Sequence, residues 1–304
     1  MKIHIGIVTW NRLELTRLCL ESLFTRTHGD FSCTVVDNGS RDGTVEYLSA
    51  CAQRMPNLTL RLLSRNMGVS VASNLAWDDA RQADFFIKLD NDVEICDPDW
   101  LLRLVRVSQA NPTLGPLGYR LCSWHTGTAR TLSDGTCVTM VSCCNGACAC
   151  IPRILHEKLG FWNEGYGRYG YEDLEYSWRA LKAGFFPAYI ERDQALVHHG
   201  TDPKQINLEQ EEMKKVSRTS ALHGTKAYLL YLFLFEQGLL PLKMGRKYLI
   251  QEVNGKYIFA LNGEYKHVQK LMNMLVKTVQ ITQDGEISCL DLHAWQSAFK
   301  TNTN

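Results

Sequence analysis

Two carboxylates one residue apart are the first feature of the chain that could do chemistry. Asp90 and Asp92 flank Asn91 in "FIKLDNDVEI", directly after an apolar run typical of a buried strand. In an extended turn both carboxylates can reach one hard cation while the side chain between them points away, and Mg²⁺ or Mn²⁺ prefers such oxygen ligands. Because Asp and Asn are common in ordinary turns, a surface turn is the competing interpretation.

A pair of histidines could complete such a site. His198 and His199 end another apolar run, in "ALVHHGTD". A neutral imidazole is a common metal ligand, so either histidine could join the acid pair. A purely structural histidine is the alternative.

A second acidic group opens a predicted helix. The stretch "YGYEDLEYSWRALKAGF" places Glu172, Asp173 and Glu175 in the first turn of that helix. Acids favour helix N-termini because of the helix dipole, so their presence can be structural. The functional interpretation makes one of them a general base that takes a proton from a hydroxyl nucleophile.

Two further positions suit a nucleotide. Asp37 closes the apolar strand "CTVVD", where a carboxylate could accept hydrogen bonds from a nucleobase edge or a ribose hydroxyl, although the "NGSRDG" that follows is also rich in turn formers. Gly68, in "RNMGVSVASN", precedes a predicted helix whose exposed amides would favour a phosphate. An ordinary helix start explains this glycine nearly as well.

The elements that must position these residues alternate along the first ninety residues. Short β-rich runs alternate with helical stretches, the runs at 2–9, 33–37, 58–64 and 84–90 and the helices at 12–26, 44–54 and 69–82. This rhythm predicts an α/β fold with a parallel sheet, in which loops at the carboxyl ends of the strands build the ligand site. We therefore expect Asp37, Asn66, Asp90 and Asp92 on one rim.

The rest of the chain is less regular. Between 96 and 200 the pattern predicts a helix after "DPDW", loops broken by Gly and Pro at 111–118, strands within 135–151 and the acidic helix. Since no linker separates this part from the first, we expect one continuous fold. After residue 200 we expect a helical appendage with a charged helix at 206–220 and a buried helix face at 227–235.

Composition limits the class of protein. A hydrophobic content of 45% and a formal net charge of +1 describe a globular chain with no global attraction to nucleic acid, so a nucleic-acid acceptor is disfavoured unless a local basic patch exists. The N-terminal stretch lacks the pattern of a signal peptide, which predicts a cytoplasmic location. The apolar run at 227–235 falls short of the ~20 residues that span a bilayer.

The cysteines are numerous but do not form a recognisable metal motif. Among the 11 cysteines, the dense group is Cys143, Cys144, Cys148 and Cys150. Its spacing fits no usual zinc pattern, and alternate residues of a strand face opposite sides. We predict reduced, buried side chains that pack as small hydrophobes.

Taken in order, the motifs resemble glycosyltransferase family 2, a family of nucleotide-sugar enzymes with the GT-A fold. The motifs lie between residues 3 and 200 and read "VTWNR", "VVDNGSRDGT", "RNMGVSVASN", "KLDNDVEI", "GACACIPRILHEKLGFWNEGYGRYGYEDLEYSWRALKAG" and "VHHG". The resemblance implies a GT-A catalytic domain at 1–200, with a Rossmann-like nucleotide-sugar-binding half at 1–95 and an acceptor half at 96–200. A mainly helical C-terminal region would follow at 201–304.

The resemblance also implies roles in donor binding. Thr9, Asn11 and Asp37 would contact the nucleoside, and Asn66 and Gly68 would lie beside the donor.

The acid pair becomes the family's D-x-D motif, which implies Mn²⁺ or Mg²⁺ as cofactor. Asp92 would bind the metal directly, and Asp90 would contact the metal shell, the ribose or the sugar. His198 matches the histidine that supplies a further ligand, with His199 as the alternative.

The helix-borne acids match the family's Glu-Asp pair. Asp173 would be the base and Glu172 an acceptor ligand, and the preceding segment "GFWNEGYGRYGYED", with Trp162, looks like the acceptor site. Inversion follows if Asp173 activates the acceptor hydroxyl for direct displacement.

The leading prediction is thus a metal-dependent inverting glycosyltransferase that uses a UDP- or dTDP-sugar and a glycan, lipid-linked glycan or other acceptor. A nucleotidyltransferase is one alternative, although it needs no base at Glu172 or Asp173. A non-catalytic sugar-nucleotide-binding protein is another. In it the apolar run at 227–235 and the basic Lys243, Arg246 and Lys247 would touch a membrane or partner, and an active enzyme could also use this segment for peripheral membrane contact.

Overall fold

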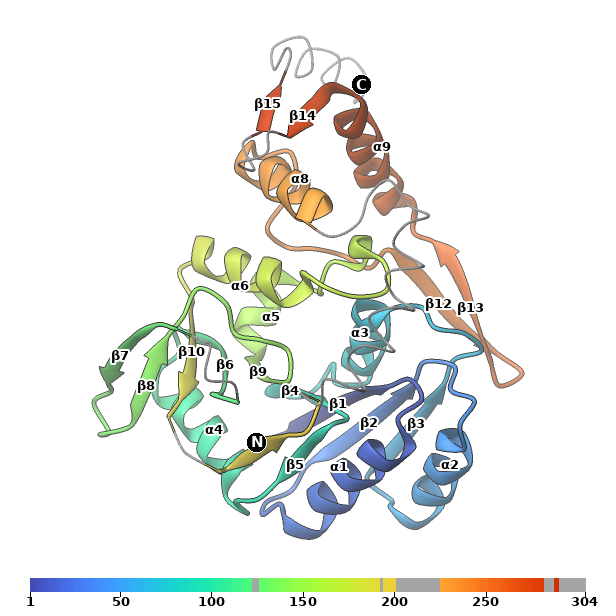
Figure 1. The fold of residues 1–304 in the computed structure, drawn as a ribbon, viewed down its shortest axis with the longest axis vertical. Helices are drawn as coiled ribbons and strands as arrows, with labels where there is room; N and C mark the ends of the chain where they lie inside the picture. Colours follow the sequence, from blue (N-terminus) through green and yellow to red (C-terminus); the bar gives the residue numbers. More distant parts are fainter. Residues whose placement is uncertain (122–125, 192–193, 201–224, 282–286, 290–304) are drawn as a thin grey trace.

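A mixed nine-stranded sheet forms the centre of the computed structural model, which describes residues 1–121, 126–191, 194–200, 225–281 and 287–289 (Figure 1). The strand order is β3-β2-β1-β4-β9-β6-β10-β8-β7. The strands are β1 (Ile3–Thr9), β2 (Ser32–Asp37), β3 (Leu58–Leu62), β4 (Phe85–Asp90), β6 (Leu114–Tyr119), β7 (Thr128–Thr131), β8 (Cys137–Met140), β9 (Cys148–Pro152) and β10 (Phe186–Ile190). The first four strands in this order are parallel, and β9 joins β4 antiparallel. The α/β class is confirmed.

Helices cover both faces of the sheet, as the alternating rhythm requires. On one face lie α1 (Leu13–Arg26), α2 (Thr44–Arg54) and α4 (Trp100–Ala110), which pack into the first buried cluster. On the other lie α3 (Val69–Asp79), α5 (Arg153–Leu159) and α6 (Glu172–Lys182), which pack into the second.

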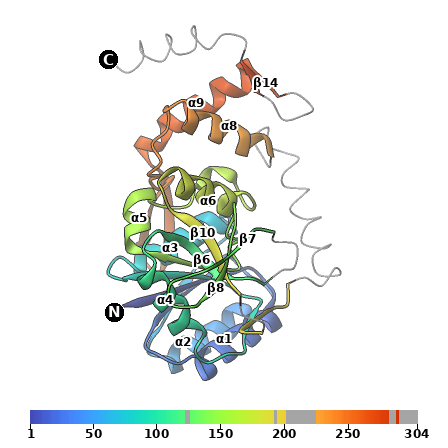
Figure 2. The same cartoon turned by 90° about the vertical axis from the view of Figure 1, so that its left-hand side faces the viewer.

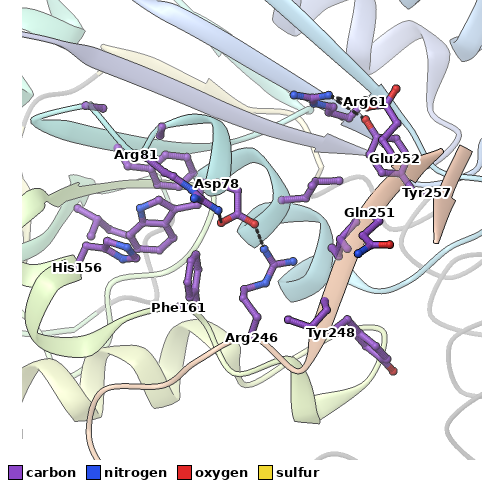
Figure 3. A pocket seen from close by; sticks show the side chains of 18 of the residues that line it. Arg61, Asp78, Arg81, His156, Phe161, Arg246, Tyr248, Gln251, Glu252 and Tyr257 are labelled. Atoms are coloured by element: carbon purple, nitrogen blue, oxygen red, sulfur yellow. Dashed lines mark hydrogen bonds and ion pairs between the residues drawn. The ribbon is translucent and has the colours of Figure 1, made fainter. Parts of the chain in front are cut away.

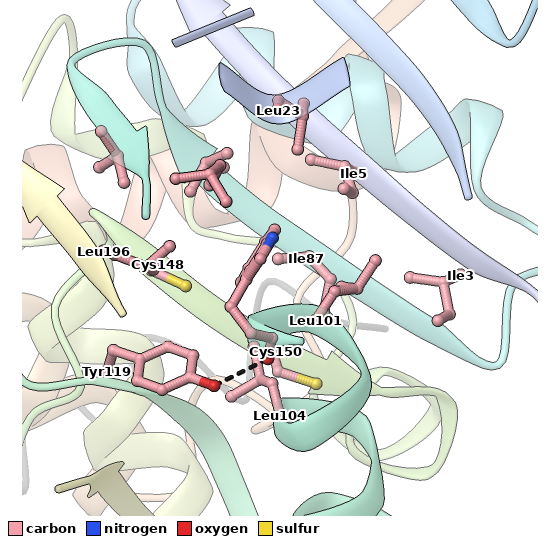
Figure 4. Packing of buried hydrophobic residues seen from close by; sticks show 14 of the residues in the cluster. Ile3, Ile5, Leu23, Ile87, Leu101, Leu104, Tyr119, Cys148, Cys150 and Leu196 are labelled. Carbon is pink, nitrogen blue, oxygen red and sulfur yellow. Dashed lines mark hydrogen bonds between the residues drawn. The ribbon is translucent and has the colours of Figure 1, made fainter. Parts of the chain in front are cut away.

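The first cluster binds sheet and helices together tightly. Figure 4 shows Leu23 of α1 and Leu101 of α4 packed against Ile5 and Ile87 of the two central strands. The hydroxyl of Tyr119 on β6 donates to the carbonyl of Trp100 at 2.7 Å and ties the sheet to α4. These contacts hold the carboxyl ends of β1 and β4 in a fixed position.

The predicted loop at 111–118 is wrong, because β6 occupies most of it and every one of its residues is buried. Glycine and proline usually break strands, but here each has a local use. The ladder between β6 and β10 shifts register between Phe186 and Ala188, which accommodates Pro116. A side chain at Gly118 would meet the carbonyl oxygen of Cys148 at 2.2 Å, so glycine allows β6 and β9 to approach.

A small second sheet carries the D-x-D turn. Strand β5 (Val93–Ile95) follows the turn directly and pairs antiparallel with β11 (Leu196–His198), so that His198 lies opposite Val93. This pairing brings the histidine motif beside the acid pair although about a hundred residues separate them in sequence.

The helices of the C-terminal region lie on the side of α6 that faces away from the central sheet (Figure 2). Helices α8 (Thr225–Glu236) and α9 (Gly263–Thr278) form a third buried cluster with Tyr166, which belongs to the short helix η1 (Glu164–Tyr166). The apolar run is confirmed as a buried helix face. Its most buried members are Ala227, Leu230, Tyr231, Leu234 and Phe235.

This region is not only helical. Strands β12 (Tyr248–Val253) and β13 (Lys256–Leu261) form a hairpin, and β14 (Val279–Ile281) pairs with β15 (Ile287–Cys289). Arg61 of β3 ties the hairpin to the sheet through Glu252 and the Tyr257 hydroxyl, each at 3.1 Å. The predicted charged helix at 206–220 lies outside the described residues.

Part of the segment predicted to contact a membrane lies inside the protein. Arg246 does not flank a membrane surface, because its side chain is 10% exposed and pairs with Glu164 and Asp78. Much of the apolar run at 227–235 is likewise buried inside the protein. No helix in the described ranges is long and apolar enough to cross a bilayer.

The prediction for the cysteine group is confirmed for three of its four members. Cys144, Cys148 and Cys150 are buried free thiols, and Cys143 is partly buried. Burial raises the pKa of Cys148 to about 12, so its thiol stays protonated. The candidate metal group found among the described residues contains no cysteine.

Candidate active site

The acid pair and one histidine meet at the carboxyl end of the sheet. Asp90, Asp92 and His198 each place a potential ligand atom within 4.8 Å of the other two. The residue between the acids points away, as expected: Asn91 Nδ2 donates to the hydroxyls of Thr9 at 3.1 Å and Thr16 at 2.9 Å. The sequence Asp-Asn-Asp therefore presents both carboxylates to the histidine.

One atom of this group lacks a hydrogen-bond donor. Asp92 Oδ1 is buried and lies 3.1 Å from His198 Nε2, but the contact does not have hydrogen-bond geometry and the oxygen has no other donor. A buried acceptor left unpaired is costly. Two carboxylates and one imidazole are a suitable donor set for Mn²⁺ or Mg²⁺. The residues thus fit a divalent cation.

Basic side chains compensate both acids. Arg12 Nη1 lies 2.7 Å from Asp92 Oδ2, and the ammonium of Lys88 contacts Asp90. Burial raises the pKa of Asp92, but His198, Arg12 and Lys88 outweigh this effect and the net pKa lies below its ordinary value. Asp92 is therefore held as a carboxylate.

The other two members of the group have raised pKa values. The side chain of Asp90 is 33% exposed, and loss of solvation raises its pKa more than Lys88 lowers it. Burial lowers the pKa of His198, but Asp92 and Asp90 reverse the effect and the net pKa is above 6.5. A proton on His198 therefore competes with a metal ion.

The backbone is unusual where β1 enters the site. Asn11 and Arg12 both adopt left-handed conformations, with φ of 57° and 67°. Such conformations cost free energy in residues other than glycine and cluster at functional sites. Here they aim Arg12 at Asp92. The side chain of Asn11 is used internally, because its Oδ1 accepts from the amide of Arg41 at 3.0 Å.

Among the predicted nucleoside contacts, Asp37 has a free acceptor and Thr9 does not have a free hydroxyl. Asp37 Oδ1 accepts from the amides of Gly39 and Ser40, while its Oδ2 is buried without a donor. Thr9 is 1% exposed, and its hydroxyl is already bonded within the protein, to Asn91 among others. Thr9 therefore supports the D-x-D turn.

The structure explains the glycine at position 68 without phosphate binding. Its φ is 98°, and a side chain there would meet the carbonyl oxygen of Gly167 at 2.3 Å. The amide of Val69, at the start of α3, already donates to Arg168 at 2.9 Å. Asn66 Oδ1 accepts from the Gly68 amide at 2.9 Å. Asn66 and Gly68 therefore allow the 167–168 loop to pack on α3.

The second acidic pair opens α6. Asp173 Oδ2 accepts from the amide of Gly146 at 3.1 Å. Glu172 is 8% exposed, and its Oε2 is buried without a donor. Burial, followed by the charge of Asp173, raises the pKa of Glu172 to about 8. Glu172 is therefore protonated at neutral pH.

The loop at 141–147 brings the two acidic pairs together. A side chain at Gly146 would lie 3.3 Å from the ammonium of Lys88, while the amide of Gly146 holds Asp173. Tyr169 is 66% exposed. The charges of Asp90, Glu172 and Asp173 act on its hydroxyl, so this side chain lies near both acidic pairs.

Comparison with known proteins agrees with this geometry. Residues 4–132 match the family model "Glycosyl transferase family 2". These residues form a family 2 glycosyltransferase domain.

Two curated relatives match part of the chain. An uncharacterized protein, y4gI, of Sinorhizobium fredii (strain NBRC 101917 / NGR234) is 31% identical over 121 residues, which are 39% of this chain and 13% of that protein. An uncharacterized glycosyltransferase, alr2836, of Nostoc sp. (strain PCC 7120 / SAG 25.82 / UTEX 2576) is 26% identical over 115 residues, which are 38% of this chain and 35% of that protein. The chain thus covers a small part of the first relative and about a third of the second.

Solved glycosyltransferases share the fold at low identity. The mannosyltransferase PcManGT from Pyrobaculum calidifontis, in complex with GDP-Man and Mn²⁺, gives a TM-score of 0.55 at 18% identity over 76% of this chain and 64% of that chain. GalNAc-T7 with UDP, GalNAc and Mn²⁺ gives 0.54 at 15% identity over 65% and 44%. TarS of S. aureus gives 0.52 at 17% identity over 65% and 36%. These likenesses confirm the GT-A fold.

Two of the predicted site residues have other surroundings than expected. Trp162 is 2% exposed and packs in the second core cluster, because Asn74 holds its backbone amide and carbonyl. Its ring supports the site from within the core, with the ammonium of Lys88 5.9 Å from the ring centre. His199 turns away from the acid pair, and its Nε2 lies 2.9 Å from Glu94.

Sequence reasoning missed four residues of the glycosyltransferase site. Arg12 and Lys88 contact the acid pair, and a side chain at Gly200 would meet Asp92 Oδ2 at 2.0 Å. All four lie inside the recognised motifs. Basic residues close to acids were an available signal for Arg12 and Lys88, whereas the contacts of Gly146 and Gly200 depend on loop geometry.

Proposed function

We propose that the protein transfers a sugar from a nucleoside-diphosphate sugar to an acceptor hydroxyl with the help of a divalent cation. The observation that carries the proposal is the group of Asp90, Asp92 and His198, with its unpaired buried oxygen on Asp92. Two similar structures are complexes of glycosyltransferases with a sugar nucleotide, or a nucleotide and a sugar, and Mn²⁺, which supports both the donor class and Mn²⁺ or Mg²⁺ as cofactor.

The reaction divides between the two acidic pairs. A cation held by Asp90, Asp92 and His198 would neutralise the charge that develops on the departing diphosphate. Asp173 takes the proton of the acceptor hydroxyl. At the same time the acceptor oxygen forms a bond to the anomeric carbon, and the bond from that carbon to the diphosphate breaks. A single displacement of this kind inverts the anomeric centre.

The neighbours of Asp173 suit this role. The amide of Gly146 fixes its carboxylate, and the proton that Glu172 retains below about pH 8 removes a competing negative charge from beside it. Protonated Glu172 can donate a hydrogen bond to an acceptor oxygen. The exposed ring of Tyr169 offers that acceptor a surface near both acidic pairs.

The finer assignments are part of the same proposal. Donor binding belongs to 1–95 and acceptor binding to 96–200, and a C-terminal region at 201–304 follows them. Asp37, with its free Oδ2, is the residue best placed to select the nucleoside. We propose UDP or dTDP as the nucleotide and a saccharide or lipid-linked acceptor, with the protein acting in the cytoplasm or peripherally at its membrane.

Calorimetric titration tests the proposal. UDP, dTDP and GDP are titrated into the protein with and without Mn²⁺, and Asp92→Ala is the control. We expect Mn²⁺-dependent binding of UDP or dTDP that the variant loses. Binding of GDP alone would overturn the choice of nucleotide, and absence of binding for all three would overturn the function.

A further inference from the structure

A pocket lies near the C-terminal end of α3, whose other end is close to the proposed active site (Figure 3). This pocket has a volume of about 780 Å³ and is formed by the C-terminal half of α3, the start of α5 and strand β12. Gly68, at the active-site end of α3, and Trp77, in the pocket wall, are separated by about 13 Å of helix. The volume is in the range of pockets that hold small ligands.

The floor of the pocket is aromatic. Trp77 stacks on Phe86 with 4.7 Å between ring centres, and its ring centre lies 4.3 Å from that of His156. Phe161 lies edge-on to His156, with 5.1 Å between ring centres. His156 and Phe161 are partly exposed. Such a floor can pack against the C–H groups of a ring.

Arg246 supplies an unused hydrogen-bond donor at the pocket wall. Its Nε donates to Glu164 at 2.5 Å, and its Nη1 donates to the carbonyl of Asn74 at 3.2 Å and contacts Asp78. The side chain is only 10% exposed, and its Nη2 is buried without a hydrogen-bond partner. Figure 3 shows the guanidinium between Asp78 and the strand that carries Tyr248, facing the pocket. An acceptor atom there would relieve an unpaired buried donor.

His156 supplies an acceptor. Its Nδ1 lies 3.1 Å from the carbonyl of Gly160, which can only accept, so Nδ1 carries the proton and Nε2 is left as an acceptor. Burial lowers the pKa of His156, which keeps the ring neutral. The pocket therefore offers both a donor and an acceptor.

The charges of the pocket argue against an ionic ligand. Four arginines line the pocket, and each already pairs with a carboxylate. Arg61 pairs with Asp79 and Glu252, and Arg246 with Asp78 and Glu164. Arg81 pairs with Asp78 and Arg153 with Asp84, each at 3.4 Å. An anion would also face the carboxylates in the pocket wall, and an ammonium ion would face the arginines. The acidic residues that line the pocket are Asp78, Glu157 and Glu252.

We propose that this pocket binds a neutral saccharide unit. A hydroxyl both donates and accepts, so one sugar can accept from Arg246 Nη2 and donate to His156 Nε2 or a carboxylate, while its C–H face packs on the aromatic floor. The inference stands on the pocket and does not require the transfer reaction. The proposed function would supply the saccharide as an acceptor or product glycan.

A bound saccharide would contact the network that holds the acceptor half. Glu164 accepts from Arg246 and from Asn74 Nδ2 at 3.0 Å, and Asn74 also donates to the carbonyl of Trp162 at 2.8 Å. The pocket is thus connected by direct hydrogen bonds to the segment that supports the active site.

Saturation-transfer NMR tests the proposal on the full chain without metal or nucleotide. The probes are maltose, cellobiose and lactose, with glucosamine and glucuronate as the cationic and anionic comparisons. We expect at least one disaccharide to bind and both charged probes to give no signal. Failure of all three disaccharides, or preferential binding of a charged probe, would overturn the proposal.

Variants locate the binding. Ala83 lines the pocket without joining its polar network, and Ala83→Trp should weaken disaccharide binding at least tenfold. Ala129→Trp, on the exposed edge strand β7, is the matched control and should bind as the wild type does. Arg246→Lys removes Nη2 and should also weaken binding. Equal affinity in Ala83→Trp and Ala129→Trp would overturn the proposal, while Mn²⁺ and nucleotide titration of the same samples tests the transfer function separately.

Discussion

The two acidic pairs of the site consist of similar residues in opposite electrostatic surroundings. Asp90 and Asp92 are contacted by Lys88 and Arg12, with His198 at 3.1 Å from Asp92. Glu172 has a buried oxygen without a donor, and the charge of its neighbour Asp173 raises its pKa further. Within the first pair Asp92 is held as a carboxylate, whereas in the second pair Glu172 is held protonated.

The difference shows that the job of a carboxylate is set by the groups around it. Cations and hydrogen-bond donors favour the charged form, while burial beside another acid favours the neutral form. Both effects occur close together, because Lys88 of β4 and Arg12 before α1 contact the first pair, whereas Glu172 at the start of α6 has a buried oxygen without a donor. The following experiments separate the two pairs.

The largest effect should follow from Asp173→Asn. Asparagine can still accept from the Gly146 amide but cannot take a proton, so we expect the rate of sugar transfer to fall by about a thousandfold. Nucleotide and Mn²⁺ affinity should stay unchanged. Rates from a donor turnover assay and affinities from calorimetry check this, with the exposed Asp134→Asn as control. An equal loss of donor affinity would contradict the division of roles.

A large loss of metal affinity should follow from Asp92→Asn. The change removes the charge that faces Arg12 and His198. Loss of a residue that only supports a metal ligand typically lowers metal affinity about 10–100-fold, so we expect the Mn²⁺ affinity to fall by at least this factor. Transfer should fall with it. Titration of Mn²⁺ measures the effect, and an unchanged affinity would remove the acid pair from the metal site.

Glu172→Gln should change the pH dependence of stability. The unfolded chain releases the Glu172 proton near pH 4.5, whereas the folded protein retains it to about pH 8. The folded state binds more protons between these values, so this residue makes the free energy of unfolding fall as the pH rises from 4.5 to about 8.

The glutamine variant lacks this titration and should be the more stable protein at high pH, by a few kcal/mol at most, since one pKa unit corresponds to about 1.4 kcal/mol. Urea unfolding of both proteins at about pH 4 and about pH 9 provides the comparison, since these values lie about half a unit below and about one unit above the titration range. Parallel pH profiles for the two proteins would show that Glu172 is not held protonated.

The smallest effect concerns His198. Because Asp92 and Asp90 raise its pKa, a proton competes with Mn²⁺ and the affinity should fall as the pH is lowered from 8 to 6, by at most about tenfold per pH unit. His198→Gln should flatten this dependence. The measurement is Mn²⁺ titration at three pH values, and a dependence that survives in the variant would assign the proton to another group.

Much of the fold was readable from hydrophobic rhythm. Helix α2 was predicted with its observed bounds, and the four parallel strands were placed correctly because apolar runs and polar loops alternate clearly there. Strand β6 was missed because the glycines and proline that break most strands are accommodated here by a register shift and a close strand contact. The β12–β13 hairpin was missed in a region expected to be mainly helical.

The sequence by itself determined which residues stand at the carboxyl ends of the strands, since that follows from local patterns. It therefore determined the acid pair, the likeness to the glycosyltransferase family and the acids at the start of α6. Only the tertiary structure decided that His198 and not His199 joins the acid pair, that Trp162 is buried, and that Glu172 keeps its proton. Each of these depends on distance and solvation between segments far apart in the chain, which no local pattern encodes.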